Sequence, residues 1–131
     1  MKKYIVIGNP IEHSLSPKLH NFWFKKNNID AVYEKKKVET NEIKDLILDL
    51  KKKKINGINV TVPFKKDVIN FLDQLSLESK ETQSVNTIFL KNDKVIGHNT
   101  DIDGFQIAIE NPMIDLKIKS ALILGAGGVV T

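Results

Sequence analysis

The 131-residue chain contains no cysteine and no arginine. Without cysteine it forms neither disulfide bonds nor a thiolate nucleophile. All 20 basic residues are therefore lysines, and with 16 acidic residues they give a net charge of +4. Proteins that read nucleic acids usually rely on arginine for base and phosphate contacts, so we expect no nucleic-acid partner. A weaker alternative is that the lysine runs at 35–37 and 51–54 steer an anionic substrate.

Long apolar runs are also missing. The first run, at 4–7, is too short for the core of a signal peptide. No segment approaches the roughly 20 apolar residues that a membrane-spanning helix needs. We therefore expect a cytosolic protein with no membrane partner. The apolar fraction of 41% and the charged fraction of 27% are typical of a globular domain.

Alternating strand and helix patterns predict an α/β fold, with a mostly parallel sheet flanked by helices. Strands are expected at 4–7, 31–39 and 55–62. Helices are expected to begin at Ser16-Pro17 and at Thr40, and a third apolar stripe of helical spacing covers 64–75. In the first helix, Leu19, Phe22 and Trp23 share one face, and we expect Trp23 to pack in the core. This order predicts parallel strands with right-handed crossovers.

Two further strands, at 84–90 and 94–98, are expected to form a hairpin around Asn92-Asp93. A helix should follow from Asp101 to about Glu110, and a buried strand should occupy 119–124. That strand leads into Gly125-Ala126-Gly127-Gly128. A strand followed by a glycine-rich turn is how a dinucleotide-binding unit begins, although Val130 stands where G-x-G-x-x-G has its last glycine. We expect the chain to be the front part of a longer one.

The segment 59–65 combines polar side chains with the end of a predicted strand. Asn59 and Thr61 should lie on the same side of this strand, at the carboxyl end where open α/β sheets bind ligands. Lys65 is expected at the start of a helix, where the helix dipole disfavours a cation, so a functional role is indicated. Taken alone, the segment equally fits a solvated strand edge with a surface lysine.

Five segments together resemble one family, the shikimate dehydrogenases, and occur in the family's order. They are residues 8–21, 59–65, 85–87, 97–105 and 125–128. The resemblance implies a shikimate-binding substrate domain at 1–100 and a linking helix and connection at 101–118. It also implies that 119–131 hold the first strand and glycine turn of an incomplete Rossmann domain. The sequence departs from the family at Gln83-Ser84, where Gly-Ala is usual.

The family reduces 3-dehydroshikimate to shikimate with NADPH. By resemblance, Ser14 and Ser16 would bind the substrate carboxylate, and Thr61, Asn86 and Asp101 would hold the ring hydroxyls. Lys65, paired with Asp101, would be the catalytic acid/base. The NADP cofactor would contact a glycine turn made of Gly125, Ala126, Gly127, Gly128 and Val129.

Several alternatives stay open. Asp101 could simply cap the following helix, and Ser16 could cap the first one while also binding the substrate. His13 and His20 lack companions at ligand spacing, so no metal is expected. The chain could instead be a stand-alone, non-catalytic binding module for shikimate-like hydroxy acids, or belong to a quinate/shikimate paralogue. A homodimer is possible, and 131 residues without a full nicotinamide site should show no turnover.

Overall fold

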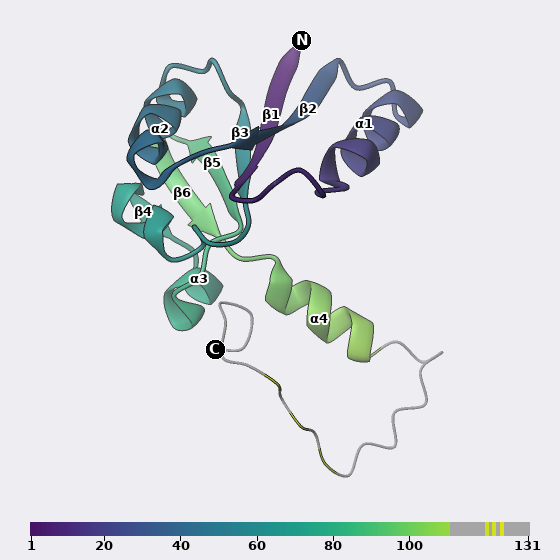
Figure 1. The fold of residues 1–131 in the computed structure, drawn as a ribbon, viewed down its shortest axis with the longest axis vertical. Coiled ribbons are helices and arrows are strands. Elements are labelled where there is room, and N and C mark those ends of the chain that lie inside the picture. Colours follow the sequence, from purple (N-terminus) through teal and green to yellow (C-terminus); the bar gives the residue numbers. More distant parts are fainter. Residues whose placement is uncertain (111–119, 121, 123, 125–131) are drawn as a thin grey trace.

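The structure is a computed structural model that describes residues 1–110, 120, 122 and 124 (Figure 1). Its elements, in chain order, are β1 (Lys2–Gly8), α1 (Ser16–Lys26), β2 (Ala31–Lys37), η1 (Thr40–Glu42), α2 (Ile43–Lys51), β3 (Gly57–Val60), η2 (Asp67–Phe71), β4 (Gln74–Leu75), α3 (Leu77–Thr82), β5 (Thr87–Lys91), β6 (Lys94–His98) and α4 (Asp101–Ile109). The predicted strand at 119–124 falls on residues that are mostly outside the described part, and the glycine turn at 125–128 lies wholly outside it.

The described strands form one mixed sheet in the order β2-β1-β3-β5-β6-β4. β1 pairs with both β2 and β3 in parallel, as the β-α-β order predicts. β5 runs antiparallel to β3 and to β6. The hairpin between β5 and β6 is confirmed, with positive φ angles at Asn92 (50°) and Asp93 (57°), as a type I′ turn requires. The prediction of an α/β fold with a largely parallel sheet is therefore confirmed.

Helices cover both faces of the parallel part of the sheet, with α2 on one side and α1 on the other (Figure 1). The predicted stripe of α2 is fully buried: Ile43, Leu46, Ile47 and Leu50. It packs in a cluster with Ile5 and Ile7 of β1. Val6, which points to the opposite face, belongs to a second cluster with Ile11 and Tyr33. Alternation along β1 thus divides the core into two layers.

The expectation that Trp23 packs in the core is wrong. Leu19, Phe22 and Trp23 are 48%, 59% and 48% exposed. The helix docks instead through the neighbouring row, where His20 stacks on Tyr33 and Phe24 packs near Tyr4. Because this row includes the polar residue His20, apolar periodicity does not mark it, and the predicted buried face of α1 was the wrong one.

The third helical stripe, at 64–75, is also wrong as a helix. The segment forms a turn, the short 3-10 helix η2 and the strand β4. Its apolar residues do enter the core, since Phe64 and Val68 are buried. The expected helix does not continue to residue 75, because Asp73 is hydrogen-bonded to β6. The Asp73 N–H donates to Val95 O at 2.9 Å, and the Asp73 carboxylate accepts the Val95 N–H at 2.8 Å. α3, which follows, was not predicted.

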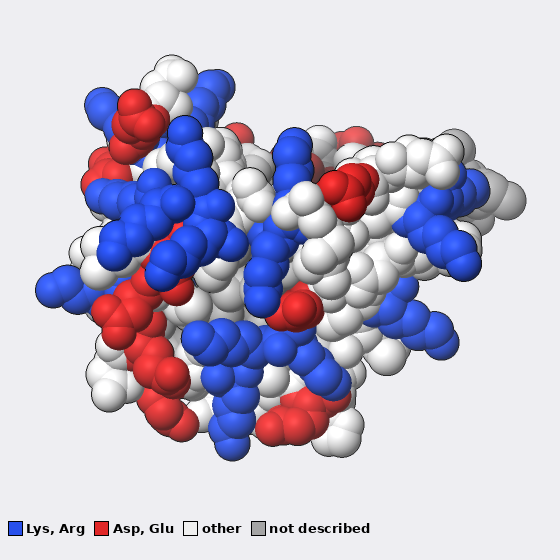
Figure 2. All heavy atoms as spheres, turned by 90° about the horizontal axis from the view of Figure 1, so that it is seen from above, with Lys and Arg blue, Asp and Glu red and all other residues white. Residues whose placement is uncertain are grey.

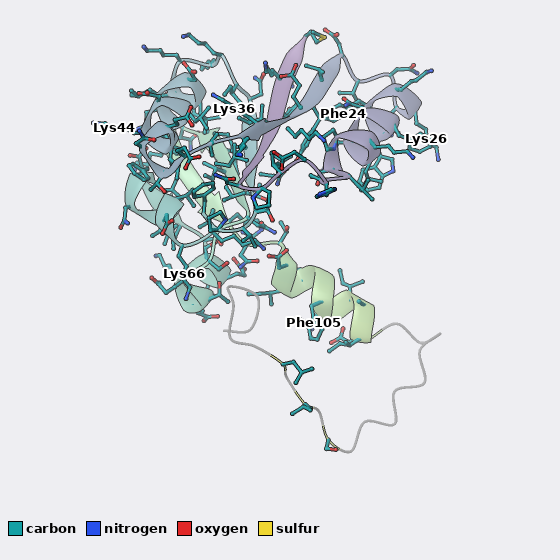
Figure 3. All side chains as sticks on the ribbon, in the orientation of Figure 1. Phe24, Lys26, Lys36, Lys44, Lys66 and Phe105 are labelled. Atoms are coloured by element: carbon teal, nitrogen blue, oxygen red, sulfur yellow. The ribbon has the colours of Figure 1, made fainter. Side chains whose placement is uncertain are left out.

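α4 confirms the helix expected from Asp101. It extends away from the sheet (Figure 1), and none of its residues is buried. Phe105, labelled in Figure 3, is 65% exposed and Ile107 is 70% exposed. In the part of the chain that is described, no helix combines the length and the apolarity needed to cross a bilayer.

The lysines gather densely on the face shown in Figure 2, with acidic side chains between them. Lys3 pairs with Glu34 at 2.7 Å, and Lys54 pairs with Asp49 at 3.1 Å. These residues also line a hollow of about 330 Å³. Exposed pairs of this kind contribute about 0–1 kcal/mol each, so they matter more for the surface than for stability.

Gln83 is strained because it ends α3 in the left-handed conformation, with φ 49° and ψ 39°, a region that favours glycine. We expect Gln83→Gly to raise the free energy of unfolding by about 0.5–1 kcal/mol, since the left-handed penalty of roughly 1–2 kcal/mol exceeds the entropic cost of glycine. Urea denaturation measures this. Asn28→Gly, at φ 54°, is the control and should gain less because asparagine tolerates this region. A loss of stability in Gln83→Gly would contradict the strain.

Ser84 is fully buried, and among the described residues its Oγ is the only buried side-chain polar atom without a hydrogen-bond partner. Ser84→Ala should therefore stabilise the chain by about 1 kcal/mol, because the desolvated hydroxyl is removed. The matched control is Ser79→Ala. Ser79 is equally buried, but its Oγ accepts a hydrogen bond from Ser76, so its removal should destabilise. Equal effects of the two substitutions in thermal denaturation would refute this account.

Candidate functional site

Two loops meet at the carboxyl ends of β1 and β3. Asn9 N–H donates to Val62 O at 3.1 Å, and Thr61 N–H donates to Ile7 O at 2.9 Å. The approach is so close that a Cβ on Gly8 would lie 2.6 Å from Thr61 Cγ2. A side chain at position 8 would therefore force Thr61 to shift. Both loops contain a cis peptide before proline, at Asn9-Pro10 and Val62-Pro63.

A hollow of about 280 Å³ opens between these loops and the start of α1. Three of the predicted substrate-binding residues line it: Ser14, Ser16 and Thr61. Ser16 N–H donates to Ser14 Oγ at 3.4 Å, which holds the two serines side by side. Ser16 is the first residue of α1, and helix N-termini favour anions. The hollow can thus receive a negatively charged group among hydroxyls.

Lys65 and Asp101, 36 residues apart in sequence, form an ion pair with Nζ 2.6 Å from Oδ2. Their side chains are 16% and 31% exposed. The pair lies between the turn after β3 and the first residue of α4. Lys65 is in a turn and not at a helix start, so the helix-dipole argument for it was wrong. The capping alternative for Asp101 does not hold either, because Thr100 is the N-cap and the Asp101 carboxylate faces Lys65.

Asn86 connects the ion pair to the rest of the site. Its Nδ2 donates to Asp101 Oδ1 and to Thr100 Oγ1, both at 2.9 Å, and its Oδ1 accepts the Thr100 N–H at 3.1 Å. The backbone of Val85 reinforces this arrangement, donating to Lys65 O at 2.8 Å. Asn86 therefore positions Asp101 as well as being a candidate ligand for the substrate.

Of the predicted site residues, the structure brings Asp101 into direct contact with both Lys65 and Asn86, and it places Ser14, Ser16 and Thr61 around the hollow. The predicted cofactor residues, 125–129, lie outside the described residues. His13 lines the hollow, whereas His20 stacks on Tyr33 with ring centroids 4.3 Å apart. Burial lowers the pKa of His20. Within residues 1–110, no group of three or more His, Asp or Glu side chains is arranged to hold a metal ion.

Sequence reasoning missed two residues, Tyr33 and Asn99. Asn99 is 1% exposed; its Nδ2 donates to Ser84 O at 3.1 Å, and its Oδ1 accepts the Asp101 N–H at 2.8 Å. The signal for Asn99 was its place directly before a predicted helix start, where asparagine commonly satisfies a free N–H. Tyr33 carried no comparable signal, since a tyrosine in a strand ordinarily indicates packing.

Removing the Asn99 amide should destabilise the chain and displace Asp101. We expect Asn99→Ala to lower the free energy of unfolding by roughly 2–3 kcal/mol, because buried donors and acceptors lose their partners. Chemical denaturation measures the change. The control is Asn41→Ala, at an exposed position of η1, which should change stability by less than about 0.5 kcal/mol. Similar values for the two variants would show that the buried amide is not needed to hold the start of α4.

Comparisons with known proteins show which family the chain resembles. The family model described as the shikimate dehydrogenase substrate binding domain matches residues 6–88. The chain is 58% identical over 130 residues to the shikimate dehydrogenase (NADP(+)) of Pelagibacter ubique, covering 99% of this chain and 49% of that protein. It is 44% identical over 127 residues to the enzyme of the same name from Pyrococcus furiosus, covering 97% and 46%.

Solved structures show the same likeness. Shikimate 5-dehydrogenase from Thermus thermophilus in complex with shikimate has a TM-score of 0.90 and 32% identity, covering 99% of this chain and 49% of that one. A shikimate dehydrogenase in complex with NADP+ has a TM-score of 0.90 and 37% identity, covering 99% and 45%. The chain spans about half the length of the curated relatives it matches. The matched region begins within β1 and ends within β5, and so covers more than half of the chain. The chain therefore belongs to the shikimate dehydrogenase family and carries that family's substrate-binding domain.

Proposed function

We propose that this chain is the substrate-binding part of an NADP-dependent shikimate dehydrogenase, which reduces 3-dehydroshikimate to shikimate. The observation that carries the proposal is the Lys65–Asp101 ion pair, 2.6 Å long, at the strand ends where the serine-lined hollow also lies. An acid/base group close to an anion-binding hollow is what a ketone that also bears a carboxylate requires.

Lys65 acts as the proton donor in this proposal. An ammonium has three N–H donors, and Asp101 accepts only one of them, so Lys65 can also donate to a substrate oxygen. NADPH, when bound, supplies the hydride that arrives at the carbonyl carbon. Lys65 Nζ gives its proton to the carbonyl oxygen, which becomes the hydroxyl of the product. In the reverse direction, the neutral amine takes that proton back. Asp101 fixes the Nζ by a charge-assisted hydrogen bond.

The substrate carboxylate is assigned to Ser14 and Ser16, where two hydroxyls and the start of α1 favour an anion. The ring hydroxyls are assigned to Thr61, Asn86 and Asp101. Both Nδ2 hydrogens of Asn86 already have partners, and its Oδ1 already accepts from Thr100 and Thr87. A substrate hydroxyl bound at Asn86 must therefore replace one of these partners. Binding of NADP to residues 125–129, a cytosolic location and a homodimeric state remain predictions.

Titration of the chain with shikimate tests the proposal. We expect saturable binding that Ser14→Ala and Lys65→Ala each weaken by about tenfold, the equivalent of one charged or well-placed hydrogen bond. Isothermal calorimetry gives the affinities, and amide NMR shows which residues respond.

The control for Lys65→Ala is Lys66→Ala, which removes the same charge from an exposed neighbour, labelled in Figure 3. It should leave the affinity within about twofold, since exposed charges act weakly on a partly buried site. If the folded chain does not bind shikimate, binds quinate more tightly, or responds equally to both lysine substitutions, the proposed site is incorrect.

A further inference from the structure

The loop between β1 and α1, residues 9–15, carries Ser14 to the hollow, and we call it the serine loop. Its buried residue is Ile11, which is 5% exposed. Two hydrogen bonds are made within the loop: Ser14 N–H donates to Ile11 O at 3.1 Å, and Ile11 N–H donates to the Glu12 carboxylate at 2.9 Å. The position of Ser14 therefore also depends on contacts that the loop makes with other elements.

The first such contact holds Asn9, at the start of the serine loop. Asn9 Nδ2 donates to Glu39 Oε1 at 3.0 Å, on the side opposite to its backbone contact with the loop after β3. Glu39 is itself fixed by a capping box with Glu42, in which each side chain accepts the backbone N–H of the other residue. The residue before it, Val38, is 1% exposed. The acceptor for Asn9 thus belongs to a segment that is anchored in the core.

The second contact holds the middle of the serine loop. Lys35 of β2 donates from Nζ to Glu12 O. In the register of the two strands, Lys35 lies beside Val6 and Lys36 lies beside Ile7. Val6 belongs to the buried cluster that includes a residue of the serine loop, whereas Ile7 belongs to the cluster on the other face. Because neighbours in a parallel register share a face, Lys35 points towards the loop and Lys36 away from it.

We propose that Lys35 and Glu39 are positioning residues of the substrate site, which hold the serine loop at its middle and its start and so keep Ser14 at the hollow. This inference rests on the proposed function. Both contacts are exposed, and exposed contacts contribute little to the stability of the fold. A loop that is not held must instead be ordered by the substrate, at the expense of affinity. Loss of either contact should therefore weaken binding and leave unfolding nearly unchanged.

Lys35→Met tests the contact in the middle of the loop, since methionine keeps an unbranched side chain and removes the ammonium. We expect it to bind shikimate about three- to fivefold more weakly in isothermal calorimetry, with an unchanged midpoint of urea denaturation. Lys35→Arg, which keeps a donor and the charge, should recover most of the affinity. The matched control is Lys36→Met, labelled as Lys36 in Figure 3, which removes the same charge from the opposite face and should stay within about twofold.

Salt separates positioning from electrostatic steering by the lysine run. At about 1 M salt the Debye length falls to roughly 3 Å, so an effect of charge at a distance is screened. The loss in Lys35→Met should persist under these conditions, because a loop that is no longer held stays unheld in salt. A loss that disappears at 1 M salt, or that Lys36→Met shares, would show that Lys35 acts only through its charge and would overturn its positioning role.

Reversing donor and acceptor tests the contact at the start of the loop. Asn9→Asp places a carboxylate against Glu39, so the donor is lost and two acceptors face each other. We expect about fivefold weaker binding of shikimate, also at 1 M salt. In the double variant Asn9→Asp/Glu39→Gln, the glutamine amide donates to the new carboxylate and the net charge returns to that of the wild type. Most of the affinity should return, and a double variant as weak as Asn9→Asp would contradict the proposed contact.

The order of the free loop gives a readout that needs no ligand. In 15N relaxation, the backbone order parameters of residues 12–14 should be lower in Lys35→Met and in Asn9→Asp than in the wild type, and Lys36→Met should not change them. Unchanged order parameters in both loop variants would overturn the positioning role. A wild-type chain that does not bind shikimate overturns the proposed function itself, and the order parameters then still show whether the two contacts hold the loop.

Discussion

The parallel pairing of β1 with β3 is the constraint on which the site depends. It aligns Ile7 with Val60, so that the two following loops leave the sheet side by side. The absence of a side chain at Gly8 lets Thr61 approach, and the loop after β1 then carries Ser14 and Ser16 to the same edge. Parallel strands place their carboxyl ends together in this way, and the hollow between the loops is the consequence.

Much of the fold follows from local patterns. The buried stripe of α2, the parallel strands and the hairpin at Asn92-Asp93 were all predictable, because each depends on periodicity or on a positive φ angle that few residues adopt. The errors have one cause. In α1 and in the segment after β3, polar side chains determine the packing, through His20 on Tyr33 and Asp73 on Val95. Hydrophobic periodicity considers only apolar residues, so it does not indicate contacts made by polar side chains.

The sequence predicted which residues belong to the candidate site, but not which of them contact one another. The resemblance to a family named Lys65 and Asp101, and the structure shows that they touch. No local pattern could indicate that Asn86 contacts the start of α4, or that the Tyr33 hydroxyl donates to Asn59, since these contacts join residues that are distant in sequence. A functional role for Lys65 was predicted from an unfavourable position at a helix start. Lys65 lies in a turn, so that reason does not hold.

The contacts that connect the loops of the site depend on asparagine, and chemistry explains the choice. The side-chain amides of Asn21, Asn59, Asn86 and Asn99 each donate through nitrogen and accept through oxygen. A carboxylate at these positions would lack the donor and would add charge beside Asp101, whereas a hydroxyl could not span two backbone groups. Because the amides of Asn86 and Asn99 are uncharged, they hold Asp101 at its side chain and at its N–H without adding a second charge, and the carboxylate stays paired with the Lys65 ammonium.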